Sequence, residues 1–322
     1  MKINLQYLDD AMNELSAIRE RNAKEEDRRR SEVHGKLPEY SQLEIDLAAT
    51  MRDIVSGLSG ASDASIEAGF EKNRKIQERM SELLISGGFT ADYLDPIYTC
   101  AKCKDKGNTG NKWCECICRL TNEFAAAALN KNAPLSRSRF DNFDLGFYPD
   151  SGNEKGPSPR EVMKQNLDEC KKFAEEFDVK GKGIFMIGGT GLGKTHLSLS
   201  IANVLINKGF CVVYISVPEL MRKLQDEQIN KKTDATMSLI LNSDLLILDD
   251  LGAENNSDWC VATIYEIINT RQNHGLPMII NSNLTARELS AAYHDRLSSR
   301  IMSMKTLLFL GKDNRVKLSD NF

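Results

Sequence analysis

The chain has 322 residues, of which 41% are hydrophobic and 27% charged, and its formal net charge at pH 7 is −4. The length suggests about two domains, and the composition is that of a soluble protein with a real core. Its apolar runs are shorter than the ~18 residues of a membrane-spanning helix, and the first thirty residues are too charged for a secretory signal peptide. We therefore expect a cytoplasmic protein with no membrane partner. Any nucleic-acid contact would need a local basic patch, because the overall charge balance is mildly acidic.

The N-terminal region is predicted to be helical. Its first apolar side chains recur three or four positions apart, which places them on one helical face, at Leu5, Leu8, Met12, Leu15 and Ile18. The pattern breaks at Leu37-Pro38, and two further helices are expected over about 43–58 and 66–85. These apolar stripes pack either on one another or on a helix of a partner.

Five of the eight cysteines lie between positions 100 and 118. In a reducing compartment this clustering favours metal binding over disulfides. Cys100 and Cys103 have a C-x₂-C spacing that can hold one side of a tetrahedral ion, and Cys114 and Cys116 on a returning strand offer two more ligands. We predict a structural zinc site with these four ligands. Cys118 is an alternative to Cys116, and a small apolar cluster of thiols is the other interpretation.

A lead-in segment separates the cysteines from the next domain. Residues 121–130 are predicted to form an alanine-rich helix, residues 148–157 an exposed loop, and residues 160–177 another helix. Phe140 and Phe143 precede this domain. They either line an adenine pocket or belong to the core.

A glycine-rich segment follows the apolar run 183–187 and precedes a helix-like run that ends at Asn207. The segment consists of Gly188, Gly189, Thr190, Gly191, Leu192, Gly193, Lys194, Thr195 and His196. This strand-to-helix context is that of a P-loop, whose backbone N–H groups and helix N-terminus bind phosphates. Lys194 would reach the β/γ-phosphates and the Thr195 hydroxyl would hold Mg²⁺. A glycine-rich turn without a ligand is the alternative.

Strands and helices alternate after this segment. Further strands are expected at 211–215, 245–248, 278–280 and 306–310. With the strand before the P-loop, they predict an α/β domain with a five-stranded parallel sheet covered on both faces. The ligand then belongs at the carboxyl ends of the strands.

The strand at 245–248 ends in Asp249 and Asp250, the pattern of a Walker B motif. Asp249 would hold Mg²⁺ through water. Asp250 is placed to orient or deprotonate the attacking water, although its side chain is shorter than the usual Glu. From the next strand, Asn283 is the candidate that positions this water, with Asn281 as the weaker alternative.

Arg296 and Arg300 lie one turn apart on a predicted helix near the end of the chain. One of them could reach the γ-phosphate of a neighbouring subunit as an arginine finger. Alternatively, both form salt bridges on the surface.

Five segments of this chain resemble the DnaC/DnaI family of AAA+ replicative-helicase loaders. They are Gly188–His196, Asp249–Glu254, Asn281–Thr285, Arg296–Ile301 and Gly311–Arg315. The cysteine segment and the lead-in at Arg139–Phe143 resemble loader sequences as well. The resemblance therefore runs from about Tyr93 to Arg315.

The resemblance implies a function and a set of roles. The protein would be an ATPase in which Lys194 and Thr195 bind ATP with Mg²⁺, Asn283 is sensor 1 and Arg300 is the arginine finger. Residues 1–95 would grip the hexameric replicative helicase, 96–120 would be the zinc module, 121–160 a linker, and 161–322 the AAA+ domain. The ATP-bound domains would assemble into an oligomer and load the helicase onto single-stranded DNA during replication initiation or restart.

Two further expectations depend on this resemblance. Only about a dozen residues follow the last predicted strand, which leaves no room for a helical lid, so hydrolysis should be slow and switch-like. Lys223, Lys231 and Lys232 could add a basic patch for single-stranded DNA.

Three other functions are weighed against the loader. An IstB-like transposition helper that binds duplex DNA is similar in sequence, but such helpers generally lack a zinc module. A nucleotide kinase would need an acceptor site and an arginine-rich lid, and neither is evident. A zinc-stapled adaptor with a decayed nucleotide site disagrees with the intact Lys194, Asp249, Asn283 and Arg300.

Overall fold

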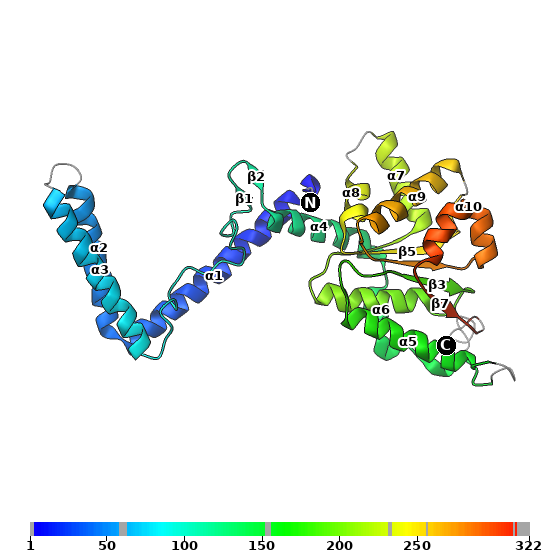
Figure 1. Cartoon of the computed structure of the whole chain (residues 1–322), viewed down its shortest axis with the longest axis horizontal. Coiled ribbons are helices and arrows are strands. Elements are labelled where there is room, and N and C mark those ends of the chain that lie inside the picture. The colour runs from blue at the N-terminus through cyan, green and yellow to red at the C-terminus, as the bar shows by residue number, and fades with distance from the viewer. Residues whose placement is uncertain are drawn as a thin grey trace. The chain divides into compact units, whose positions relative to one another are not determined.

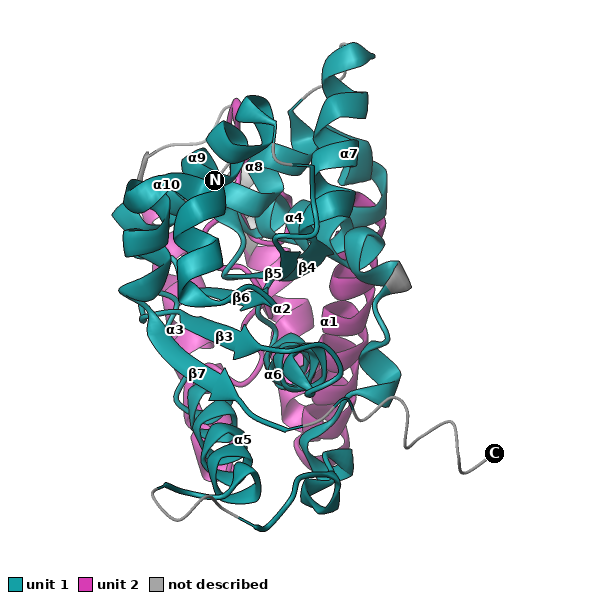
Figure 2. Ribbon diagram, turned by 90° about the vertical axis from the view of Figure 1, so that its right-hand side faces the viewer, with its two compact units in different colours: residues 1–11, 115–322 teal, residues 12–114 magenta. Residues whose placement is uncertain are grey.

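The computed structural model describes residues 3–57, 63–151, 156–230, 234–255, 257–311 and 313. The chain divides into two compact units, one of residues 1–11 with 115–322 and one of residues 12–114 (Figure 2). Within the described ranges, no helix is both long enough and apolar enough to cross a membrane.

The three helices predicted in the N-terminal region are present. They are α1 (Leu8–Lys36), α2 (Pro38–Gly57) and α3 (Asp63–Ser86). A small core joins them, made by Val33, Tyr40, Leu83 and Leu84. Leu43 of the second predicted stripe packs against this core, whereas Ile45, Phe70 and Ile85 stay exposed. Leu58, which was expected in the second helix, lies outside the described residues.

The first predicted stripe was wrong at Leu5. This residue lies in a separate 3₁₀ turn, Leu5–Tyr7, and is exposed. The turn forms because the Asn4 side chain accepts a hydrogen bond from the backbone N–H of Gln6 and so caps it. The amphipathic helix begins only at Leu8.

The cysteine segment folds as a short hairpin followed by a helix. Strands β1 (Asn108–Thr109) and β2 (Lys112–Trp113) pair antiparallel, and helix α4 spans Glu115–Leu129. The returning strand therefore ends at Trp113, and the expectation that Cys114 and Cys116 lie on it was wrong. The helix was expected from residue 121, but it starts at Glu115, so Cys116 lies in its first turn.

The large sheet has five parallel strands in the order β4-β5-β6-β3-β7. They are β3 (Ile184–Gly188), β4 (Val212–Ser216), β5 (Leu245–Leu251), β6 (Met278–Ser282) and β7 (Lys305–Phe309). The prediction of a five-stranded parallel sheet is confirmed. This order places the carboxyl ends of β3, β5 and β6 side by side.

Helices cover both faces of the sheet, as predicted (Figure 1). One face carries α5 (Pro159–Glu175) and α6 (Lys194–Asn207). The other carries α7 (Val217–Ile229), α8 (Ala235–Asn242), α9 (Asp258–Asn273) and α10 (Ala286–Met302). Alternate residues of β3, β4, β5 and β6 enter two separate cores, with Met186 and Ile247 toward α5 and α6 and Phe185 and Leu248 toward the other helices.

A fully buried arginine at the end of α9 fixes the entry of two strands. The Arg271 guanidinium donates hydrogen bonds to the carbonyl oxygens of Ile240 and Ser243 before β5, and to that of Pro277 before β6. Burial lowers the pKa of Arg271 to about 9. Arg271 thus connects β5, which carries Asp249, to β6, which precedes Asn283. The connection lies at the amino ends of these strands, opposite the candidate site at their carboxyl ends.

Candidate functional site

A cavity of about 400 Å³ lies at the carboxyl ends of the central strands. Its floor is the turn between β3 and α6, which contains the predicted P-loop. The other walls come from the β5 and β6 ends and from the lead-in segment. The lining includes Asn142, Phe143, Asp144, Tyr148, Thr190, Gly191, Leu192, Gly193, Lys194, Thr195, His196, Asp250 and Asn283.

The P-loop backbone needs glycine at its last turn. Gly193 has a φ of 90°, in the left-handed region, and is the N-cap of α6. A Cβ at this position would lie 2.8 Å from Cε2 of Phe143 and 3.0 Å from the Tyr148 hydroxyl. The same hydroxyl donates a 2.9 Å hydrogen bond to the Leu192 carbonyl. The lead-in segment therefore braces the loop directly.

Lys194 is buried at the start of α6, and its ammonium lies on the loop itself. Nζ donates hydrogen bonds of 2.7 Å to each of three acceptors, the carbonyl oxygens of Gly188 and Gly189 and Oδ1 of Asn283. Phosphate oxygens are stronger acceptors for an ammonium than carbonyls are. The arrangement therefore suits a phosphate that enters between the loop and Asn283.

Asp249 is only 3% exposed, and both of its carboxylate oxygens accept hydrogen bonds. Oδ2 accepts from the Thr195 hydroxyl at 2.9 Å and from the Tyr214 hydroxyl at 2.7 Å. Oδ1 accepts from Nδ2 of Asn281 at 2.8 Å. A hydroxyl and a carboxylate in contact offer the hard oxygen ligands that Mg²⁺ prefers. The structure thus brings together Thr195 and Asp249, the two residues predicted to hold this ion.

Tyr214 was missed in the sequence. It lies on β4, which is next to β5 in the sheet. Burial, and then the charge of Asp249, raises the pKa of the Tyr214 phenol, so that it stays a donor. The only signal in the sequence was the Tyr214 hydroxyl within the otherwise apolar run 211–215.

Asp250 and Asn283 face the cavity, whereas Asn281 does not. Asp250 is exposed and has a φ of 55°, which is unusual for a residue with a side chain. It lies where the register between β5 and β6 shifts, between Leu248 and Leu251. Nδ2 of Asn283 lies 3.5 Å from Oδ1 of Asp250. Asn281 is fully buried and holds Asp249 instead.

The two lead-in aromatic residues differ in position. Phe143 borders the cavity, with its ring centroid 5.9 Å from that of Tyr148 and 5.5 Å from that of His196. His196 Nε2 lies 2.9 Å from the Arg139 carbonyl oxygen. Phe140 packs against the core on the α5 and α6 side of the sheet.

Arg300 is not among the residues that line this cavity. Its guanidinium lies 3.4 Å from Oε1 of Gln272 and stacks over Tyr265 at 5.9 Å from the ring centroid. Arg296, one turn earlier, is exposed. A role of Arg300 as a finger therefore requires a neighbouring subunit and stays a prediction.

Parts of two other predicted features are outside the described residues. Of the lysine patch, Lys223 lies half-buried on α7, and Lys231 and Lys232 are not described. Of the Gly311–Arg315 segment, Gly311 and Asp313 are described.

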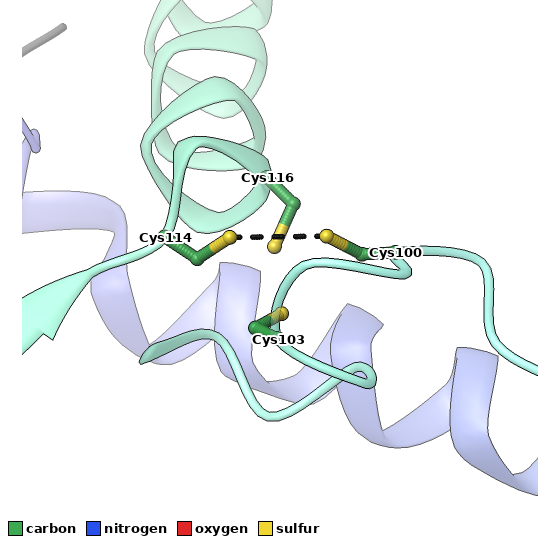
Figure 3. Close-up of side chains that lie close together, drawn as sticks. All are labelled: Cys100, Cys103, Cys114 and Cys116. Atoms are coloured by element: carbon green, nitrogen blue, oxygen red, sulfur yellow. Dashed lines mark hydrogen bonds between the residues drawn. The ribbon is translucent and has the colours of Figure 1, made fainter. Parts of the chain in front are cut away.

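Four cysteines form a second compact group (Figure 3). The sulfur atoms of Cys100, Cys103, Cys114 and Cys116 all lie within 4.8 Å of one another, and those of Cys100 and Cys114 are 3.8 Å apart. Zn–S bonds of about 2.3 Å give a tetrahedron with edges of about 3.8 Å. The group therefore fits a zinc ion. Cys118, farther along α4, is buried and is not part of this group.

The loop that carries the first two cysteines is held by its own hydrogen bonds. The backbone N–H of Gly107 donates to Cys103 Sγ at 3.4 Å. The Asp105 carboxylate, 1% exposed, accepts from the backbone N–H groups of Thr99 and Cys100 and from Nδ2 of Asn22. Such contacts orient the ligands of structural metal sites.

A comparison with known protein families finds a match to the part of the chain that contains the cavity. Residues 165–304 match the family described as "IstB-like ATP binding protein". This part of the chain is therefore similar to IstB-like ATP-binding proteins. The predicted α/β class, with a five-stranded parallel sheet after a helical N-terminal region, is confirmed, and the assignment to the AAA+ proteins stays a prediction.

Two relatives extend the comparison. The chain is 24% identical over 259 residues to the replicative helicase loader DnaI of Bacillus subtilis (strain 168), which covers 74% of this chain and 80% of that protein. It is 30% identical over 139 residues to the replicative helicase loader DnaC of Escherichia coli (strain K12), covering 42% of this chain and 56% of that protein. A crystal structure of the DnaC helicase loader matches 55% of this chain and 99% of that one, with 24% identity and a TM-score of 0.47. The two sequence matches indicate homology, at low identity, to replicative helicase loaders.

Proposed function

We propose that this protein loads a hexameric replicative DNA helicase onto single-stranded DNA and uses ATP binding and hydrolysis as its switch. One observation carries the proposal: the Thr195 hydroxyl contacts Asp249 beside Lys194 and Asn283, at one cavity, in a homologue of DnaI and DnaC. These side chains are the ones predicted to bind the phosphates and Mg²⁺, and their proximity supports the proposal. Homology supports the helicase as partner.

The residues of the cavity divide the work on ATP. Lys194 would exchange its carbonyl acceptors for the β/γ-phosphates, and the N-terminus of α6 would add its positive end. Thr195 and Asp249 would hold Mg²⁺, which neutralises charge on the phosphates when it is bound. Asp250 and Asn283, 3.5 Å apart at the cavity wall, would position the attacking water.

Slow hydrolysis supports a switch rather than a turnover enzyme. Asp250 is shorter than the Glu that commonly does this work, and Arg300 lies outside the cavity of its own chain. Hydrolysis would then depend on a neighbouring subunit that supplies Arg300. Self-assembly in the presence of ATP follows from this arrangement.

The helical N-terminal region would grip the helicase. Ile45, Phe70 and Ile85 on α2 and α3 are exposed apolar side chains available to a partner. The four-cysteine group would hold zinc as a structural ion, since four protein ligands leave no open coordination position.

A second candidate is an IstB-like transposition helper, which the family match over residues 165–304 favours. Such a protein would bind duplex DNA together with a transposase. The two candidates therefore differ in both the partner and the form of DNA.

Loading onto a closed circle of single-stranded DNA tests the proposal, because a helicase ring must be opened to enclose a circle. With this protein and ATP, we expect helicase to be retained on the circle in gel filtration. Lys194→Ala should lower retention to the level of helicase alone, whereas Lys164→Ala, at an exposed lysine of α5, should leave it unchanged. Full loading by Lys194→Ala would contradict an ATP switch. Binding only to duplex DNA with a transposase would favour the second candidate.

A further inference from the structure

The segment from Tyr98 to Trp113 presents positive charge in a chain whose net charge is −4. All four of its lysines, Lys102, Lys104, Lys106 and Lys112, are exposed. Its only acidic residue is Asp105, which is 1% exposed and accepts internal hydrogen bonds. The acidic side chain therefore supports the fold of the loop, and the exposed charged side chains of this segment are its four lysines.

Two aromatic side chains lie exposed on the same segment. Tyr98 is 44% exposed and Trp113 is 45% exposed, which is more than is typical of side chains of this size. The Lys104 ammonium lies 5.7 Å from the Tyr98 ring centroid. The Lys104 ammonium and the Tyr98 ring thus lie close together on this segment.

Lysines interleaved with exposed rings are the chemistry that binds single strands. Ammonium groups contact the phosphates, and each ring stacks with a base irrespective of sequence. In a duplex the bases are already stacked and the rings have no access to them. An acidic peptide would satisfy the lysines but would leave both rings without a partner of matching shape.

We propose that this surface, which we call the module face and define as Tyr98, Lys102, Lys104, Lys106, Lys112 and Trp113, binds single-stranded nucleic acid. The inference goes beyond the proposed function, because it places a nucleic-acid contact outside the ATP-binding domain and requires no nucleotide. It also gives the lysines a use other than as counter-charge to the four thiolates.

Fluorescence of Trp113 tests stacking directly. The chain has two tryptophans, so Trp259→Phe leaves Trp113 as the only one. Short oligothymidine, added without ATP, should quench this emission, and the same length of duplex should quench it far less. Unchanged emission in the presence of saturating oligothymidine would overturn the stacking. Quenching by duplex to the same extent would also overturn it.

Salt dependence tests the lysines. Affinity for a single strand falls with salt, with a negative slope of log affinity against log salt to which each phosphate contact contributes about 0.7. We expect the double variant Lys104→Gln with Lys112→Gln to make this slope less steep by about 1.4. The matched control is Lys72→Gln with Lys75→Gln, which removes the same charge from exposed positions of α3 and should leave the slope unchanged. An equal effect in both pairs would mean that only net charge matters and would contradict the proposal.

A labelled oligonucleotide and a metal assay complete the test. Trp113→Ala should weaken binding, read by anisotropy, by about tenfold and keep the metal content of the protein. If Lys104→Gln with Lys112→Gln loses metal and leaves oligonucleotide affinity unchanged, the lysines serve the thiolates and the proposal fails. These assays contain neither ATP nor helicase, so their failure is distinct from failure of the loader function.

Discussion

The Asp249 carboxylate is a buried group at the candidate nucleotide site, and it accepts hydrogen bonds from several elements. A carboxylate that is 3% exposed requires hydrogen-bond donors in place of water. Thr195, Tyr214 and Asn281 supply them from three different elements, and each donor is neutral. The charge of Asp249 is thus held in one orientation but is not cancelled. It remains available to a cation.

Replacing Tyr214 by Phe tests this role. The ring would stay in place, but Asp249 would lose one donor and part of its fixed orientation. We expect the Mg²⁺ concentration at half-maximal ATP hydrolysis to rise by about tenfold, since a hydrogen bond to a charged group contributes roughly 1.5–3 kcal/mol. ATP binding without Mg²⁺ should be nearly unchanged.

The matched control is Tyr293→Phe. Tyr293 is also buried and donates its hydroxyl to a carboxylate, that of Glu254, which is not part of the Asp249 contacts. If both variants shift the Mg²⁺ dependence equally, Tyr214 acts through general stability and not through Asp249.

These residues also show how far the sequence predicts a site. Lys194, Thr195, Asp249 and Asp250 belong to local motifs, whose spacing alone places them after a strand. The contact of Tyr214 with Asp249 depends on β4 lying beside β5, which local spacing does not encode. Motif analysis therefore finds the residues predicted to bind ATP and Mg²⁺ and misses a residue such as Tyr214, which positions one of them.

At the scale of elements, the periodic segments were predicted best. Every strand and helix expected after position 160 is present, with ends that differ by a few residues. The errors lie where a short-range contact competes with the apolar pattern. Asn4 caps a separate turn at Leu5, and α4 begins at Glu115, ahead of the alanine-rich stretch that revealed it.

The start of α4 leads to a prediction about the metal. Cys116 lies in the first turn of this helix, and its sulfur belongs to the four-cysteine group. We expect Cys103→Ser or Cys116→Ser to release zinc and to unfold the hairpin, whereas ATP binding persists. Metal content and tryptic cleavage near Lys112 would report the two effects.

Cys118→Ala is the control for this experiment. Cys118 is on the same helix and is buried, but it is not in the group. It should keep the metal. Loss of zinc from Cys118→Ala, with zinc retained by Cys116→Ser, would reverse the assignment of the fourth ligand.

At the scale of the whole molecule, the chain packs as two units that do not follow chain order. Residues 1–11 join residues 115–322, and the Asn4 backbone N–H donates to the Thr121 hydroxyl of α4. A contact between positions so far apart leaves no local pattern in the sequence. The functional boundaries predicted at 95, 120 and 160 stay predictions.

The two units suit a protein with two kinds of partner. One carries the ATP-binding domain, and the other carries the exposed apolar residues of α2 and α3 together with the module face. In the proposed function, ATP would control how many copies of the ATP-binding unit associate. It would thereby control how many copies of the other unit contact one helicase ring.

The mass of the complex with helicase is the most direct test of this account. We would mix the protein with the replicative helicase of the same source and measure size-exclusion chromatography with light scattering, with and without ATP and Mg²⁺. The account predicts a discrete complex whose helicase transfers to single-stranded DNA only when nucleotide is present. Absence of a complex under every condition would contradict it, and a transposase on duplex DNA would then be the partner to test.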